Sequence, residues 1–165
     1  IDDKSRKEME FAQSIGCEAG NHTYTHAFLS KLTKEEIAEE FAKTTKLLEE
    51  FTGKTPVLGR IPYMEASDLI HETAGFPLAH CYVDSKDYTG IPTEEIIKNI
   101  MDAEAKDELE NAIVLLHEHY QTTAGAVEYM IPTLIEKGYR FVTISELAKQ
   151  HGITLEKGVL YSRLD

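Results

Sequence analysis

Gly20-Asn21-His22-Thr23-Tyr24-Thr25-His26 is the stretch around which the rest of this chain is organised. Its two histidines lie four residues apart, so that one helical turn or a tight loop can aim both imidazoles at one point. Imidazole is the commonest side-chain ligand of zinc and similar transition metals. The spacing alone is weak evidence, because seven histidines among 165 residues make a chance pair unremarkable. Support for a metal site has to come from elsewhere in the chain.

The composition is that of an ordinary globular protein. Hydrophobic residues make up 42% and charged residues 28% of the chain, and 165 residues suit one domain or most of one. The formal net charge of -12 disfavours nucleic acid and anionic membranes as partners, because both would repel it. No apolar run approaches the ~18 residues that a membrane span needs. The polar opening Ile1-Asp2-Asp3-Lys4 does not indicate a signal peptide.

Predicted helices and strands alternate along the chain. The two cysteines, Cys17 and Cys81, lie in predicted strands and are expected to be buried small hydrophobic residues, because two cysteines make no disulfide framework. Alternation with short connections predicts an α/β fold with mostly parallel strands. Apolar spacing, capping residues and breakers predict helices at about 4–15, 33–52, 67–73, 92–101, 123–137 and 145–151, and strands at about 17–20, 57–61, 78–83, 113–116 and 140–143.

Polar residues with reactive side chains follow four of the predicted strands. In parallel α/β folds the carboxyl ends of strands carry the functional residues, so these side chains are expected to collect at one edge. They are His22 and His26, Arg60, Asp84 and Asp87, and His117. Four strand ends with such residues are much stronger evidence for a functional site than one pair of histidines.

At these positions the sequence resembles the polysaccharide deacetylases, the family-four carbohydrate esterases with a NodB-homology domain. The matching motifs are Gly20-Asn21-His22-Thr23-Tyr24-Thr25-His26, Arg60-Ile61-Pro62-Tyr63, Asp84-Ser85-Lys86-Asp87-Tyr88 and Leu115-Leu116-His117, followed by a similar tail over 135–147. They occur in the family's order. The resemblance implies a distorted, incomplete (β/α) barrel, of which residues 1–165 form the C-terminal major part of a single catalytic domain.

The resemblance implies a metal centre at the two histidines. His22 and His26 would bind a divalent metal, zinc or else cobalt or nickel, which lowers the pKa of a bound water and polarises an acetyl carbonyl. The alternative, hydrogen bonding within the loop, needs no metal.

The resemblance also assigns an acid and its supports. His117 would be the general acid, and Asp87 would be the carboxylate that favours its charged form. Arg60 cannot be a base, because it stays protonated; the matching arginine of the family holds the catalytic aspartate. From the residues alone, His117 is equally well explained as a strand-end histidine, and Arg60 as half of a surface salt bridge.

Three further residues would complete the pocket. The backbone N–H of Tyr63 would contribute to an oxyanion site, and Tyr88 and Leu115 would surround the acetyl methyl group. A plain turn aromatic and ordinary core packing are the alternatives. Tyr88 stands where the family commonly has tryptophan, and Ile61 departs from the arginine motif, which suggests an altered pocket shape.

The family's first motif, Thr-Phe-Asp-Asp at the end of a strand, is the largest departure. It supplies the catalytic base and the third metal ligand, yet only about twenty residues precede His22. Asp2-Asp3 is interpreted as an acidic pair at a helix start. The base and third ligand are therefore expected from an absent upstream segment or a companion chain, and the first strands of the barrel are expected to be missing.

The resulting hypothesis is a metal-dependent hydrolase that removes acetyl groups from a carbohydrate, with N-acetylglucosamine-containing polymers as the expected substrate. Acetylated xylan and a small non-sugar amide can be hydrolysed by the same chemistry. The sequence therefore leaves open whether the bond that is cleaved is an amide or an ester. A non-catalytic carbohydrate-binding or scaffold remnant of the same fold is the alternative, and a plain α/β domain is a third. The resemblance implies a secreted or cell-envelope setting, and the residues themselves leave a cytoplasmic one open.

Overall fold

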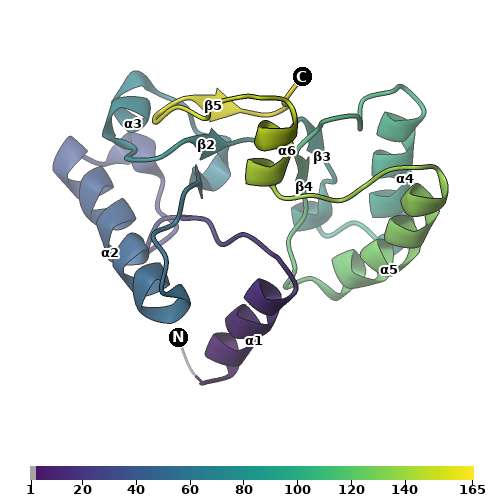
Figure 1. Ribbon diagram of the computed structural model, residues 1–165, viewed down its shortest axis with the longest axis horizontal. Helices are drawn as coiled ribbons and strands as arrows, with labels where there is room; N and C mark the ends of the chain where they lie inside the picture. Colours follow the sequence, from purple (N-terminus) through teal and green to yellow (C-terminus); the bar gives the residue numbers. More distant parts are fainter. Residues whose placement is uncertain (1–2) are drawn as a thin grey trace. The chain divides into compact units, whose positions relative to one another are not determined.

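The computed structural model describes residues 3–165, and Figure 1 shows the path of the chain. The α-helices are α1 (Asp3–Ser14), α2 (Lys34–Thr52), α3 (Asp68–Thr73), α4 (Thr93–Glu104), α5 (Gln121–Glu136) and α6 (Ile144–Gln150). The short 3-10 helices are η1 (Leu29–Lys31), η2 (Pro62–Met64) and η3 (Asp87–Thr89), and the strands are β1 (Gly59–Arg60), β2 (Leu78–Ala79), β3 (Val83–Asp84), β4 (Val114–Leu115) and β5 (Leu160–Tyr161).

The chain divides into two compact units. The first unit comprises Ile1–His80 and Gly152–Tyr161, and the second comprises Cys81–His151 and Ser162–Asp165. Each unit has its own parallel sheet and its own buried apolar cluster. The predicted α/β class with mostly parallel strands is therefore confirmed.

In the first unit, β2 lies between β1 and β5 in a parallel three-stranded sheet. Helix α2 begins at a capping box, in which the Thr33 hydroxyl accepts the Glu36 N–H and the Glu36 carboxylate accepts the Thr33 N–H. The helix ends at Gly53, where the sequence predicted a break. The φ of Gly53 is 67°, in the left-handed region that is common for glycine after a helix end. The apolar face of α2 packs into a core of Leu29, Ile37, Phe41, Ile61, Ile70, Ala74, Phe76 and Leu78.

Gly59 is the position in this sheet where a side chain does not fit. A Cβ at Gly59 would lie 2.0 Å from Cε2 of Phe76, whose ring packs edge-to-face on Phe41 with centroids 5.1 Å apart. Gly59→Ala is therefore expected to lower the free energy of unfolding by about 1–3 kcal/mol, as overpacking of a core does. Gly75→Ala is the matched control, because a Cβ there meets no atom within 4 Å. Denaturant titration of both variants checks this, and equal stabilities would contradict it.

In the second unit, β3 and β4 form a parallel pair with Val83 opposite Val114 and Asp84 opposite Leu115. Helices α4 and α5 run side by side, as Figure 1 shows. Their apolar faces and β3 share a core of Val83, Ile96, Ile100, Ala103, Leu109, Ala126, Met130 and Leu134. This packing places the end of β3 and the segment after β4 next to the start of α5.

The strand predictions were partly wrong. Residues 17–20 and 140–143 form no strand, and the predicted strand 78–83 is two strands, β2 and β3, in different sheets. The segment 17–20 follows a helix end instead, since the Cys17 N–H donates to the Ala12 carbonyl at 2.9 Å. Residues 140–143 only connect α5 to the Thr143 cap of α6. Strand β5 was not predicted, because two residues carry no periodic signal.

Burial also differs from the expectation at several residues. Cys17 is exposed and Cys81 half-buried, so the predicted burial of both cysteines was wrong. Val114 is 36% exposed, although it lies in the predicted strand 113–116, which consists of apolar residues alone. Asp2 lies outside the described residues. Helix α1 begins at Asp3, which agrees with the predicted helix start there. Among residues 3–165, no helix has the length and apolar character to cross a membrane.

Candidate active site

The predicted metal ligands lie together in the first unit. The rings of His22 and His26 meet edge-to-face, with centroids 4.9 Å apart and an interplanar angle of 80°. Nδ1 of His22 lies 2.8 Å from the Arg60 carbonyl oxygen. A carbonyl only accepts, so Nδ1 carries the proton, and the lone pair is on Nε2, the form in which histidine binds a metal. The donor set at this loop therefore fits a divalent transition metal.

Asn21 attaches the His22 end of the loop to the core, a role that the sequence did not indicate. It is 1% exposed, and its Nδ2 donates to the Phe41 carbonyl and to the Thr45 hydroxyl, both at 2.9 Å. Its Oδ1 accepts the Thr23 N–H at 2.9 Å. Its backbone forms an isolated parallel bridge to Gly59. These bonds join the loop to α2, to β1 or to itself. The backbone that carries His22 is therefore held in place on several sides.

The arginine motif packs against the same loop. Tyr63, in η2, stacks on Phe28 with centroids 3.8 Å apart and an angle of 6°, and it contacts the His26 ring edge-to-face at 4.8 Å. Tyr63 and Met64 have left-handed φ values of 57° and 55°, which are costly for residues other than glycine. The backbone N–H of Arg60 donates to the Asn21 carbonyl at 2.7 Å. His22, His26, Arg60 and Tyr63 thus belong to one cluster.

Glu65 supports this arrangement from the end of η2. Its carboxylate accepts the backbone N–H of Ser30 at 3.0 Å and the Ser30 hydroxyl at 2.7 Å. Burial alone raises the pKa of Glu65, but the two bonds from Ser30 and the nearby Lys31 outweigh it and lower the pKa below its ordinary value. The charged carboxylate therefore joins η1 to η2 at neutral pH.

The predicted acid and its carboxylate lie together in the second unit. Asp87 is fully buried, and its Oδ1 lies 2.7 Å from Nδ1 of His117. Its Oδ2 accepts the backbone N–H of His117 at 2.5 Å and the Thr123 hydroxyl at 2.9 Å. The Asp87 backbone N–H donates to the Ser85 hydroxyl at 3.3 Å. Three donors therefore converge on one buried carboxylate, and two of them come from His117.

The electrostatics of this pair follow from the contacts. Burial alone raises the pKa of Asp87, but the hydrogen bonds from the His117 side chain and backbone and from Thr123 outweigh it and lower the pKa. Asp87 is therefore an anion at neutral pH. Because a carboxylate only accepts, Nδ1 of His117 carries the proton, which leaves Nε2 as the nitrogen that exchanges protons. The His117 side chain is 24% exposed, so part of it is accessible from solvent.

The remaining predicted pocket residues surround His117 and the end of β3. The Tyr88 ring lies edge-to-face with His117 at 5.7 Å, and its hydroxyl donates to Asp84 at 3.0 Å. Lys86 forms an ion pair with Asp84 at 2.7 Å. Leu115 is 3% exposed and lies opposite Asp84 in the sheet. Tyr88 thus lies beside His117, and Leu115 is buried in the sheet that ends at Asp84.

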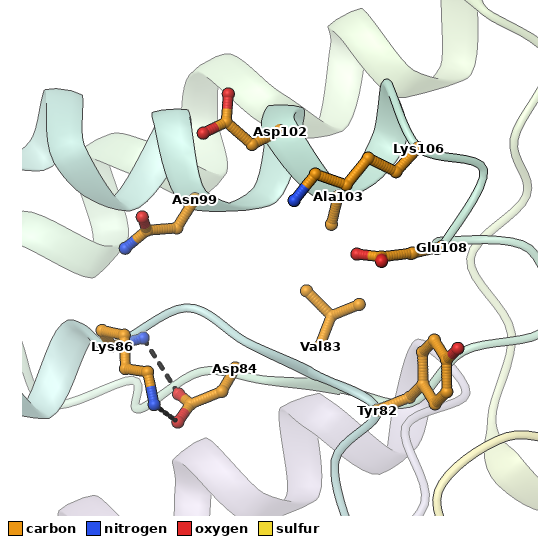
Figure 2. A pocket seen from close by; sticks show the side chains of 9 residues that line it. All are labelled: Tyr82, Val83, Asp84, Lys86, Asn99, Asp102, Ala103, Lys106 and Glu108. Atoms are coloured by element: carbon orange, nitrogen blue, oxygen red, sulfur yellow. Dashed lines mark hydrogen bonds and ion pairs between the residues drawn. The ribbon is translucent and has the colours of Figure 1, made fainter.

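A shallow depression with a volume of about 270 Å³ lies in the second unit between β3 and α4 (Figure 2). The side chains of Val83 and Ala103 point toward each other in it, and the Asp84–Lys86 pair lies at one end. Its other lining residues are Tyr82, Asn99, Asp102, Lys106 and Glu108. Only Asp84 among these was a predicted site residue.

The predicted site residues therefore form two groups, one in each unit. Within residues 3–165 no set of three or more histidine, cysteine, aspartate or glutamate side chains is arranged to hold a metal ion. The predicted metal ligands, His22 and His26, therefore stand as a pair. The supporting residues Asn21, Ser30, Glu65 and Thr123 were not found from the sequence. Hydrogen-bonding side chains have no periodic pattern, and their partners lie far away in the chain.

Comparison with known proteins gives the class of this chain. Residues 2–76 match the family model for polysaccharide deacetylases. The chain is 31% identical over 150 residues to the peptidoglycan-N-acetylglucosamine deacetylase PgdA of Listeria monocytogenes, an alignment that covers 88% of this chain and 30% of PgdA. The chain spans about 30% of the length of the curated relatives that head the comparison.

Solved structures show the same fold. The peptidoglycan deacetylase PdaC of Bacillus subtilis superposes with a TM-score of 0.80 and 26% identity, covering 87% of this chain and 69% of that one. A family 4 acetyl xylan esterase from Clostridium thermocellum, solved with a cobalt ion, superposes with a TM-score of 0.87 and 19% identity, covering 99% and 80%. The chain is thus similar to the polysaccharide deacetylases, the family-four carbohydrate esterases. This likeness confirms the predicted fold class, a part of the family's distorted barrel.

Proposed function

We propose that this chain is the C-terminal major part of a single catalytic domain that hydrolyses acetyl groups on a carbohydrate. The observation that carries the proposal is the buried Asp87, which holds both the ring and the backbone of His117, the family's acid position. A plain structural histidine would not need a fully buried carboxylate with three donors. Relatives named as peptidoglycan deacetylases support N-acetylglucosamine-containing polymer as the substrate, and with it a cell-envelope or secreted setting.

His22 and His26 would hold a divalent metal, zinc or else cobalt or nickel. When bound, such a metal supplies an activated water and polarises the acetyl carbonyl. Catalytic zinc sites use three protein ligands, so the histidine pair leaves one ligand to be supplied. That ligand and the catalytic base come from an Asp-Asp motif outside these 165 residues, in an upstream segment or a companion chain.

His117 acts as the general acid. Its Nε2 donates a proton to the leaving nitrogen or oxygen as the acetyl bond breaks, while Nδ1 stays bound to Asp87. The charged Asp87 stabilises the imidazolium before the transfer and keeps the ring in the orientation that points Nε2 at its target. Tyr88 limits the rotation of the ring on one side.

Arg60 and Tyr63 complete the chemistry at the histidine loop. The Arg60 guanidinium holds the incoming catalytic aspartate, for which its planar fork is suited. The Tyr63 backbone N–H donates to the oxyanion, and the contacts of the Tyr63 ring, stacked on Phe28 and edge-to-face with His26, support this assignment. Tyr88 and Leu115 bound the space for the acetyl methyl group.

His117→Ala in the complete protein tests this assignment. Deacetylation of an N-acetylglucosamine oligomer is expected to fall by about a hundredfold to a thousandfold, as removal of a general acid does. Metal content by elemental analysis is expected to stay at the wild-type level, because His117 is not a ligand.

His119→Ala is the matched control, because His119 is exposed and contacts His117 and Tyr120 only through its ring. We expect it to retain activity within about threefold of the wild type, as surface substitutions usually do. Loss of metal in His117→Ala, or an unchanged rate, would refute the assigned role.

A further inference from the structure

The backbone between His22 and His26 is unfavourable by itself. Thr23 and His26 both have left-handed φ values, 64° and 57°. Such conformations are costly for residues other than glycine and persist only where surrounding contacts impose them. In this conformation the centroid of the His26 ring lies 4.9 Å from that of the His22 ring. Some group must therefore hold the middle of the loop, residues Tyr24 and Thr25.

That group is Glu40, on the second turn of α2. One of its carboxylate oxygens accepts the backbone N–H groups of Tyr24 at 2.9 Å and Thr25 at 2.7 Å. The other accepts the Thr25 hydroxyl at 3.0 Å. A charged carboxylate satisfies three donors of the loop at once, and bonds to an ionised acceptor are stronger than neutral ones.

Helix α2 is a rigid support for this contact. It runs for 19 residues from a complete capping box, and Ile37, Phe41 and Leu48 bury its inner face. Asn21, at the other end of the loop, bonds to the carbonyl of Phe41 and to Thr45 on the same helix. One helix therefore holds the loop at its Asn21 end and in its middle.

We propose that Glu40 is a positioning residue, which holds the loop in the conformation that aims His26 at the metal shared with His22. The inference rests on the proposed function, since it concerns the same metal site. Glutamine at this position keeps one oxygen that can accept both N–H groups, and its NH₂ group can donate to the Thr25 hydroxyl oxygen, so the substitution removes the charge and nearly keeps the shape. The proposed role therefore requires the negative charge, which makes the bonds to the loop stronger than neutral ones.

Glu40→Gln in the complete protein is the test, with Glu39→Gln as matched control. Glu39 is the adjacent residue of the same helix. It forms an ion pair with the exposed Lys43, with 2.8 Å between Oε1 and Nζ. Zinc affinity is measured by competition with a chromophoric chelator, and cobalt-substituted protein is examined by visible absorption. We expect Glu40→Gln to bind zinc at least about tenfold more weakly with an altered cobalt spectrum, the size seen when outer-shell partners are removed, and Glu39→Gln to match the wild type.

Two further measurements separate positioning from simple destabilisation. Amide protons of Tyr24 and Thr25 are expected to exchange faster in Glu40→Gln, whereas the metal-free unfolding midpoint stays close to that of Glu39→Gln. Zinc affinity within twofold of the wild type, or an equal loss in both variants, would overturn the proposal. If the wild-type protein bound no metal, the proposed function would fail, and unchanged exchange at Tyr24 and Thr25 would then overturn the loop-holding role separately.

Discussion

His22→Ala is expected to empty the metal site and to lower deacetylation by about a thousandfold or more in the complete protein. A catalytic metal lowers the pKa of bound water to about 7, and that advantage is lost when the metal leaves. The substitution removes one of three expected ligands, and it also removes the 2.8 Å bond that joins the loop to the Arg60 carbonyl. Elemental analysis and a deacetylation assay on the same preparation give the result.

The control for His22→Ala is His151→Ala, the same substitution at an exposed histidine after α6. It is expected to keep both metal and activity. His22→Ala, which loses both metal and activity, should thus differ from His117→Ala, which loses activity but keeps its metal. Full metal content in His22→Ala would disprove the ligand assignment. A complete wild-type protein that binds neither zinc nor cobalt would instead favour the non-catalytic, carbohydrate-binding alternative.

Asp87→Asn is expected to lower deacetylation by about a thousandfold to ten-thousandfold and to destabilise the fold as well. An amide cannot accept hydrogen bonds from all three donors, so the His117 ring loses its fixed tautomer. The same change in a catalytic triad lowers kcat about ten-thousandfold. A buried donor left without an acceptor costs about 1–3 kcal/mol, and more when the lost partner is charged. The free energy of unfolding should therefore fall by about 2–4 kcal/mol.

The pH dependence of this stability has a definite sign. The pKa of Asp87 is lower in the folded protein than in the unfolded chain, so its stabilising effect is present above the ordinary carboxyl range and is lost as the pH falls through the folded value. The stability difference between wild type and Asp87→Asn should shrink in acid. Asp102→Asn, at an exposed helix position paired with Lys98, is the control and should change stability by less than about 0.5 kcal/mol. A difference that stays constant into acid would contradict the assigned charge.

The helices were predictable from the sequence because their signals are local. The capping box of Thr33 and Glu36, the amphipathic face that follows and the break at Gly53 all lie within one helix, and the structure contains each. The strands were less predictable, since all are two residues long and depend on partners elsewhere. The apolar run 78–83 contains nothing that indicates its division between two sheets. That division is set by β5 for Leu78 and by β4 for Val83.

The residues of the candidate site were predictable, but not the residues that support them. The histidines, Asp87 and His117 stand in ordered motifs that resemble a family. Glu40, Thr123 and the Ser30–Glu65 pair stand in no motif, and their hydrogen bonds join residues 15 to 36 positions apart. Such partners become visible only when the chain is folded.

The sequence by itself determined which reactive groups this protein carries, their order along the chain and the helices that support them. Only the tertiary structure decided which nitrogen of each key histidine holds a proton. For His22 that choice depends on the Arg60 carbonyl, 38 residues away, and for His117 on the Asp87 carboxylate, 30 residues away. A histidine has two nearly equivalent neutral forms, and the hydrogen bond that one nitrogen makes selects between them. The chemistry of both imidazoles is therefore a property of the fold.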